Sequence, residues 1–161
     1  MRPVINVADL KLDHQVFGER FESADKSFGS VIGLTDLGIS YSEVPPGKSS
    51  CPFHNHHIEE ELFLILDGKG TYRFGAERFE VRKGDVLSAP AGGPETAHQL
   101  LNTGSTTLRY IGISTNHPTE VVEYPDSGKF LVSSLTKGGR KVRYMGREQP
   151  GLDYWDGEKT S

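Results

Sequence analysis

The stretch that decides the fold runs from Gly47 to Gly68 and reads GKSSCPFHNHHIEEELFLILDG. His54 and His56 are two positions apart, so both imidazoles leave the same face of an extended segment. Glu61 opens the apolar run 62–66, and a turn before it would return its carboxylate to a place beside the two imidazoles. Two His and one carboxylate with open coordination positions form a known transition-metal arrangement.

Three other residues affect the assignment of this site. His98, thirty-seven residues beyond Glu61, is a fourth candidate ligand. Glu59 and Glu60 compete with Glu61, because the carboxylates of a Glu run are usually solvated. Imidazole and carboxylate accept Mn, Fe, Co, Ni, Cu and Zn, so the sequence predicts one divalent transition metal without naming it.

Length and charge limit the class of protein. A chain of 161 residues fits one domain with a single core. The net charge is −4 and no basic block occurs, so no nucleic-acid partner is expected. The longest apolar run, 62–66, is far shorter than the roughly 20 residues that span a bilayer, so no membrane partner is expected either. A single cysteine, Cys51, and no apolar leader after Met1 favour a cytoplasmic location.

Short runs rich in Val, Ile, Phe and Tyr are separated by Gly and Pro, which predicts many short strands with tight turns. In 77–82, Phe79 and Val81 alternate with charged residues, which predicts one buried and one wet face. No stretch shows sustained helical periodicity, so the fold class is predicted to be all-β. The predicted strands are 31–34, 38–44, 61–66, 71–74, 77–82, 86–89, 98–102, 107–115, 121–124, 129–133 and 141–145.

The chain divides into three predicted parts. Residues 1–29 are expected to form an N-terminal arm that packs on a partner subunit, with an irregular stretch over 10–21. Residues 30–115 are predicted to form the β-barrel core. Residues 116–161 are predicted to form an extension packed on the barrel, because a disordered tail would seldom need Tyr154 and Trp155.

With strands and histidines placed, the chain resembles a cupin. The first cupin motif has Gly, a short spacer, His-x-His, four residues, Glu, six residues and Gly. It is matched by Gly47, His54, His56, Glu61 and Gly68, with a spacer after Gly47 that is one residue longer than usual.

The second cupin motif has Gly, five residues, Pro-x-Gly, a short spacer, His, three residues and Asn. It is matched by Gly84, Pro90, Gly92, His98 and Asn102. Five residues separate Gly92 from His98 where two are usual. The two motifs in order cover residues 47–102, and the flanking strands fit a cupin barrel over about 30–115.

The resemblance implies a double-stranded β-helix, the jelly-roll cupin barrel. It also implies a homodimer, and one divalent ion held by three His and one Glu. In this sequence these ligands would be His54, His56, Glu61 and His98.

Small single-domain cupins of this kind are similar to candidate sugar-phosphate isomerases. The resemblance therefore favours an enzyme that isomerises or epimerises a small polar carbonyl compound, such as a sugar or sugar phosphate, bound in the barrel. A metal-dependent dioxygenase or decarboxylase of a small organic acid is one alternative, and a non-catalytic small-molecule-binding cupin is another. The general base stays open among metal-bound hydroxide, Glu60 and an inward tyrosine: Tyr41, Tyr72 or Tyr110.

Overall fold

The fold is built almost entirely from strands. The computed structural model describes residues 3–139 and 141–159. Within these residues the only helices are short 3-10 turns, none of which is long and apolar enough to cross a membrane. They are Val7–Asp9, Ser30–Ile32 and Pro94–Thr96.

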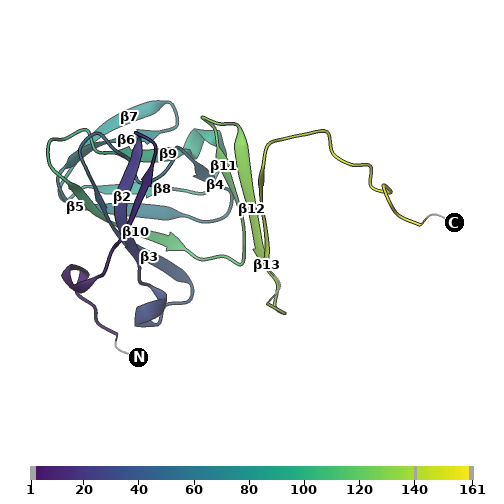
Figure 1. The fold of residues 1–161 in the computed structure, drawn as a ribbon, viewed down its shortest axis with the longest axis horizontal. Coiled ribbons are helices and arrows are strands. Elements are labelled where there is room, and N and C mark those ends of the chain that lie inside the picture. The colour runs from purple at the N-terminus through teal and green to yellow at the C-terminus, as the bar shows by residue number, and fades with distance from the viewer. Residues whose placement is uncertain (1–2, 140, 160–161) are drawn as a thin grey trace.

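One layer is a six-stranded sheet with the order β1-β2-β3-β10-β5-β8 (Figure 1). Every neighbouring pair in it is antiparallel. Its strands are β1 (Asp13–Phe17), β2 (Phe21–Ser27), β3 (Leu37–Val44), β10 (Leu108–Thr115), β5 (Glu61–Asp67) and β8 (Val86–Ala89).

The facing layer consists of two smaller sheets, with the orders β7-β6-β9 and β13-β12-β11-β4. A single antiparallel bridge between His54 and His98 connects them. Antiparallel sheets that face each other in this way form the double-stranded β-helix, or jelly roll. The strands are β7 (Glu77–Arg82), β6 (Lys69–Phe74), β9 (His98–Leu101), β13 (Lys141–Gly146), β12 (Lys129–Leu135), β11 (Thr119–Tyr124) and β4 (Asn55–His56).

The core lies between the layers and follows strand alternation. Ile65 and Tyr110 are paired across β5 and β10 and are 1% and 5% exposed. Phe63, on the same face of β5, packs against this cluster. Arg109, of opposite parity to Tyr110, points outward to Glu43 at 3.1 Å, as expected from alternation. The buried cluster comprises Val44, Ile65, Tyr72, Val81, Leu87, Leu100, Leu108 and Tyr110.

The last residue of the first motif, Gly68, makes the tight turn from one layer to the other. Its φ is +87°, and a Cβ there would lie 2.7 Å from the carbonyl oxygen of Thr107. Only glycine meets both requirements without strain.

Two expectations for the N-terminal third are wrong. The stretch 10–21 is not irregular, because β1 lies within it and pairs with β2 as a hairpin at the sheet edge. Every residue of β1 is exposed, so no alternation marks the strand in the sequence. The predicted strand 31–34 is instead the 3-10 turn Ser30–Ile32, which ends at Gly33 with φ +93°.

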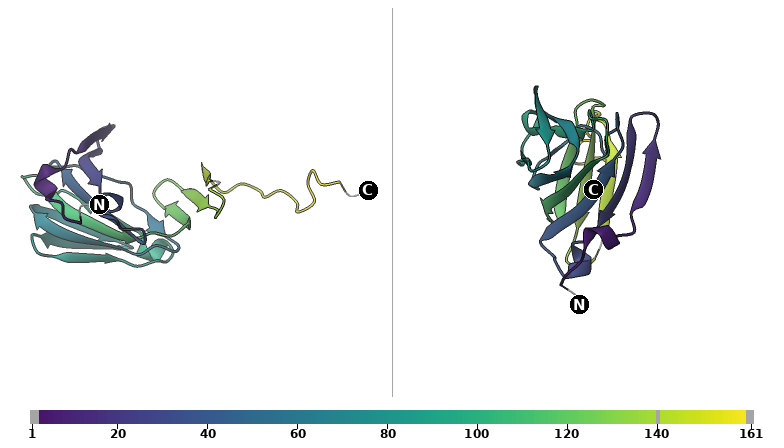
Figure 2. Two further views of the ribbon diagram at one scale, coloured as in Figure 1. Left: turned by 90° about the horizontal axis from the view of Figure 1, so that it is seen from below. Right: turned by 90° about the vertical axis from the view of Figure 1, so that its left-hand side faces the viewer.

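Two further expectations fail at exposed edges. Phe79 is 46% exposed rather than buried, because β7 is an edge strand. The C-terminal tail does not pack on its own barrel, as Figure 2 shows. Tyr154 and Trp155 pack on each other, with ring centroids 4.8 Å apart, and stay 83% and 63% exposed. Pairing of β11 with β4 is what joins residues 119–146 to the barrel.

Candidate metal centre

Three imidazoles converge on one carboxylate oxygen between the layers. The Nε2 atoms of His54, His56 and His98 lie 3.6, 3.3 and 3.0 Å from Oε2 of Glu61. These are the four residues implied as ligands by the sequence resemblance. Glu61 opens β5 in the six-stranded sheet, whereas the imidazoles come from the facing layer.

The backbone accounts for this convergence. His54 and His98 exchange two backbone hydrogen bonds, of 3.1 and 2.7 Å, which places their side chains next to each other. His56 follows on the same face as His54, two residues along. The additional residues of the second motif fold into the turn Pro94–Thr96, so they do not displace His98 from this register.

Nearby carbonyl oxygens orient two of the imidazoles. Nδ1 of His54 lies 2.9 Å from the Pro52 carbonyl oxygen, and Nδ1 of His98 lies 3.3 Å from that of Thr96. Because a carbonyl only accepts, these contacts favour a proton on Nδ1 and a lone pair on Nε2, which points to the centre. Metal-binding histidines are commonly held by such contacts.

His56 provides the test of whether the site fits an ion. Both of its ring nitrogens are buried without a hydrogen-bond partner among the described residues. An unpartnered buried polar atom is costly, and coordination of a cation by Nε2 would remove that cost. Three neutral imidazoles and a carboxylate also suit a divalent transition metal, so these residues fit the ion that the sequence predicts.

The electrostatics of the centre follow from Glu61. Burial opposes its ionisation, but the close contacts of its carboxylate with the three imidazoles hold the pKa of Glu61 well below its usual range. Burial likewise lowers the pKa of His54, but interactions with Cys51 and Glu61 outweigh it and raise that pKa to about 10. Burial lowers the pKa of His98. Without a metal, His54 is therefore cationic at neutral pH, and metal binding must release its proton.

A buried carboxylate behind His56 was not identified from the sequence. Glu120 is 5% exposed, and its Oε2 lies 3.7 Å from Nδ1 of His56. It accepts hydrogen bonds of 2.6 to 3.2 Å from the backbone amides of residues 57, 58, 59 and 121. It therefore fixes the loop that joins His56 to Glu61. Strand alternation could have indicated that Glu120 is buried, because Glu120 and the buried Val122 are two residues apart and lie on the same face of β11.

Tyr124 supports the centre from the same face of β11. Its ring stacks on His54 with centroids 6.1 Å apart. Because β11 pairs with β4 through Val122 and His56, Glu120 and Tyr124 flank that pair and lie behind different imidazoles. Tyr124, like Glu120, therefore supports the centre from a strand outside both motifs.

The remaining candidates have other surroundings. Glu60 is exposed. Glu59 accepts a 2.8 Å hydrogen bond from the backbone N–H of His117, and its other oxygen is 4.0 Å from Nδ1 of His56. Asn102 donates to the carbonyls of Val44 and Thr106, so it fixes the turn after β9.

Two tyrosines point inward, but their hydroxyls are bound. The Tyr72 hydroxyl donates to the Ser88 carbonyl at 2.8 Å, and the Tyr110 hydroxyl is 2.6 Å from Ser50 Oγ. Burial raises the pKa of both phenols, so both stay neutral. Tyr41 lies on the outer face, where it donates to Glu43 at 2.7 Å.

A cavity of about 360 Å³ adjoins the centre, and Glu61 and Phe63 line it. It lies against the inner face of β3, β10 and β5 and the segment 27–34. The inner face is made of small residues here: Gly38, Ser40, Gly112 and Ser114. A small polar molecule in this cavity would touch the Glu61 end of the centre.

Comparison with known proteins agrees with this geometry. Residues 40–114 match the family model described as the cupin domain. This range includes all four convergent side chains and both motifs. This region of the chain is a cupin domain.

Two solved structures resemble this chain over most of its length. A candidate sugar phosphate isomerase from Acidithiobacillus ferrooxidans has a TM-score of 0.75 and 28% identity, over 89% of this chain and 92% of that one. A cupin-superfamily sugar phosphate isomerase from Silicibacter pomeroyi has a TM-score of 0.77 over 96% and 98% of the two chains. At 20% identity, the second likeness shows the fold alone.

Curated relatives match over shorter stretches. An oxalate-binding protein of Thermotoga maritima is 32% identical over 71 residues, which are 44% of this chain and 55% of that protein. The chain spans 55% to 65% of the length of three such relatives, this one included.

Proposed function

We propose that this cupin is a metal-dependent enzyme that isomerises or epimerises a small polar carbonyl compound, such as a sugar or sugar phosphate. The observation that carries the proposal is the convergence of three Nε2 atoms on Glu61 Oε2 beside a cavity. His54, His56, Glu61 and His98 would hold one divalent transition metal. A bound metal of this kind polarises a carbonyl oxygen and so acidifies the neighbouring C–H group.

The protein residues divide the remaining tasks. Pro52 and Thr96 carbonyls orient two imidazoles, and Glu120 fixes the loop that positions the third. Glu60 does not suit the role of general base, because it is exposed. Tyr72 does not suit it either, because its proton is bound to the Ser88 carbonyl.

The similarity to an oxalate-binding protein supports two alternatives that take a small organic acid, which are a dioxygenase or decarboxylase and a non-catalytic binding cupin. The same donor set serves oxygen chemistry when the metal is iron or manganese. A non-catalytic binding cupin would differ from both by saturable ligand affinity without conversion.

One experiment separates these functions. The purified protein is analysed for metals, and proton NMR in D₂O follows a panel of aldoses, ketoses and their phosphates with and without oxygen. We expect about one metal per chain, and deuterium at the carbon next to the carbonyl whether or not oxygen is present. Conversion that requires oxygen would establish the oxygenase, and absence of any exchange would overturn the isomerase.

Variants connect this activity to the centre. His98→Ala should lose metal and exchange together. The control is His57→Ala, because the His57 side chain is exposed and its Nε2 lies 3.5 Å from the Glu123 carboxylate. Full metal content in His98→Ala would overturn the ligand assignment.

We further propose that the protein works in the cytoplasm as a homodimer in which the arm 1–29 contacts the partner subunit. Support comes from the exposed apolar side chains of this arm, Val16 at 54% and Phe17 at 66%. Light scattering after size exclusion should give twice the chain mass, and removal of residues 1–12 with Phe17→Ser should return it to one.

A further inference from the structure

The cavity beside Glu61 has one acidic residue and no basic residue in its described lining. Among the described residues that line it, none is Lys, Arg or His, and Glu61 is the only ionisable one. A phosphate monoester carries about −1.5 to −2 charge at neutral pH. A divalent ion with the Glu61 carboxylate sums to a single positive charge, so the centre balances at most one ligand charge. The rest would stay unpaired in a partly buried site, which is costly.

The polar groups that the cavity does offer are hydroxyls. Ser40 and Ser114 lie on the inner faces of β3 and β10 and line the cavity. Neither hydroxyl makes a hydrogen bond to any other residue in the described ranges 3–139 and 141–159. A hydroxyl both donates and accepts, so these two groups suit a ligand that is itself rich in hydroxyls.

Glycines opposite the two serines provide the space. A Cβ at Gly38 would lie 2.5 Å from Ser114 Oγ, and a Cβ at Gly112 would lie 3.0 Å from Ser40 Oγ. A larger residue at either glycine position would therefore cover or displace the hydroxyl of the serine opposite it. Phe63, which lines the same cavity, offers an apolar face of the kind on which the C–H side of a sugar ring packs.

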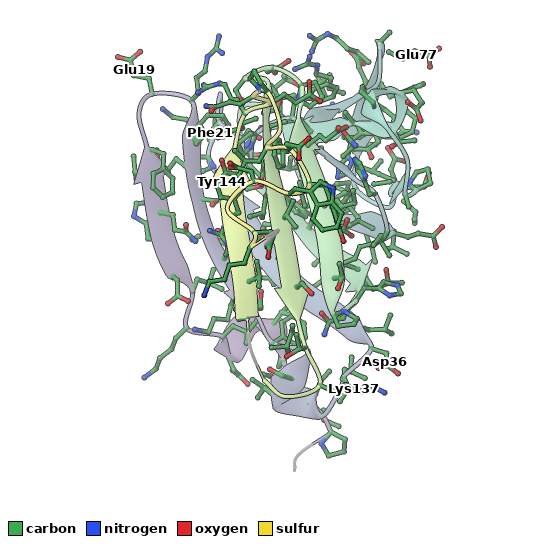
Figure 3. The ribbon with its side chains drawn as sticks, turned by 90° about the vertical axis from the view of Figure 1, so that its right-hand side faces the viewer. Glu19, Phe21, Asp36, Glu77, Lys137 and Tyr144 are labelled. Carbon is green, nitrogen blue, oxygen red and sulfur yellow. The ribbon has the colours of Figure 1, made fainter. Side chains whose placement is uncertain are left out.

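The cations that could recognise a phosphate gather elsewhere. Arg20, Lys48, Arg73, Arg78 and Lys129 line a separate hollow of about 500 Å³, which shares no lining residue with the cavity. In Figure 3, Phe21, which lines the hollow, lies toward one end of the molecule. Asp36 lies near the other end, where its carbonyl binds the backbone amide of the cavity residue Asn116.

From these observations we infer that the cavity takes an uncharged polyhydroxy carbonyl compound, such as a free aldose or ketose, rather than its phosphate ester or a dicarboxylate. The inference rests on the proposed function, whose site it shares, and narrows it to one substrate class. Selection comes from hydroxyl hydrogen bonds and from the absence of a cation to balance a second negative charge.

Binding to the metal-loaded full-length protein tests this inference. Calorimetry or ligand-observed NMR compares matched pairs: ribose with ribose 5-phosphate, glucose with glucose 6-phosphate, and fructose with fructose 6-phosphate, with oxalate as a separate anion. We expect at least one free sugar to bind about tenfold or more tightly than its phosphate. The measurements are repeated in Arg20→Ala/Arg78→Ala, in which anion binding in the basic hollow is weakened, so that its contribution can be recognised.

Variants of the cavity give the second readout. Ser40→Ala and Ser114→Ala should each weaken sugar binding by roughly threefold to tenfold, as for the loss of one hydrogen bond. Ser134→Ala, on β12 outside the cavity, is the control. Leu37→Arg, which adds a cation to the lining from a side chain 43% exposed, should improve binding of the phosphate ester relative to the free sugar.

Each outcome has one meaning. Tighter binding of a phosphate ester or of oxalate in the Arg20→Ala/Arg78→Ala background would overturn the inference, as would failure of every free sugar to bind. Unchanged sugar binding in Ser40→Ala and Ser114→Ala would also overturn it. If a free sugar binds as expected but is not converted, the inference stands and the proposed enzymatic function fails.

Discussion

The motif region, residues 47–102, and the C-terminal sheet strands β11–β13 serve the same centre in different ways. The motif region supplies all four convergent donors, which are Oε2 of Glu61 and three imidazole Nε2 atoms within 3.6 Å of it. The C-terminal sheet supplies no donor to that oxygen, but Glu120 and Tyr124 lie behind two of the imidazoles. The comparison teaches that metal chemistry restricts the donors to imidazole and carboxylate groups. The residues that support these donors depend instead on which segment packs behind the imidazoles.

The largest expected effect is in the motif region. Glu61→Gln removes the charge on which the imidazoles converge and replaces one acceptor oxygen with an amide nitrogen that only donates. We expect metal affinity to fall by at least about 100-fold, more than for loss of a supporting residue. Metal content after dialysis against a weak chelator measures it. The neighbouring Glu60→Gln should retain its metal, and equal loss in both variants would contradict the assignment of Glu61.

The second prediction concerns the acid–base state of the same four side chains. In metal-free protein the pKa of His54 is raised to about 10, so its stabilising contribution is complete below the ordinary imidazole pKa of about 6.5 and is lost as pH rises toward 10. The pKa of Glu61 is lowered, so its contribution is present above about pH 4.3 and is lost on acidification. Together, His54 and Glu61 should stabilise the metal-free chain most between about pH 4.5 and 6.5, whereas the lowered pKa of His98 opposes this stabilisation as pH falls below about 6.5.

Denaturant unfolding with chelator at pH 6, 8 and 10 measures this profile. We expect the free energy of unfolding to fall by on the order of a few kcal/mol across the range, and much less in His54→Gln. Metal affinity should change in the opposite direction and rise with pH, because binding expels the His54 proton. Parallel stability profiles for the natural chain and His54→Gln would contradict the raised pKa.

The third prediction moves to the C-terminal sheet. Glu120→Gln keeps the size of the side chain. The new amide group has only one acceptor oxygen for the four backbone N–H groups that donate to Glu120. Stability should fall by about 1.5–3 kcal/mol, as for hydrogen bonds to a charged group. Metal affinity should fall about 10-fold to 100-fold through the displaced loop after His56.

Thermal unfolding and metal titration separate the two effects of this variant. Glu80→Gln, an exposed carboxylate on β7, is the control. Unchanged metal affinity in Glu120→Gln would mean that β11 supports the fold but not the centre.

The same contrast explains what the sequence could predict. Periodic spacing and two motifs indicated every barrel strand from 38 to 115 and the four convergent side chains, because donor type and spacing are local properties. The role of Glu120 was not predicted, because it depends on the long-range pairing of β11 with β4, which brings Glu120 to the loop after His56. The hairpin β1–β2 was also not predicted, because an exposed edge strand has no buried face to pattern it. The tail was expected to dock because Trp155 and Tyr154 are aromatic, but in the structure the two rings contact each other edge to face and stay exposed.

The smallest expected effect concerns an ion pair between the two regions. Arg73 on β6 donates to both carboxylate oxygens of Asp126, in the turn between β11 and β12, at 2.6 and 2.8 Å. The guanidinium holds the pKa of Asp126 below its usual value. Because Asp126 is 55% exposed, Asp126→Asn should cost only about 0.5–1 kcal/mol, and the loss should shrink in 1 M salt.

Comparison with a second surface pair sharpens this prediction. Asp13→Asn breaks the 2.9 Å contact of Asp13 with Lys26 in the β1–β2 hairpin and should cost less, because that pair is not bidentate. Arg73 would keep its place 3.5 Å above the Phe53 ring after Asp126→Asn, so part of the interaction survives the substitution. A loss above about 2 kcal/mol that is insensitive to salt would show that this contact, and not the pairing of β11 with β4, attaches the C-terminal sheet to the barrel.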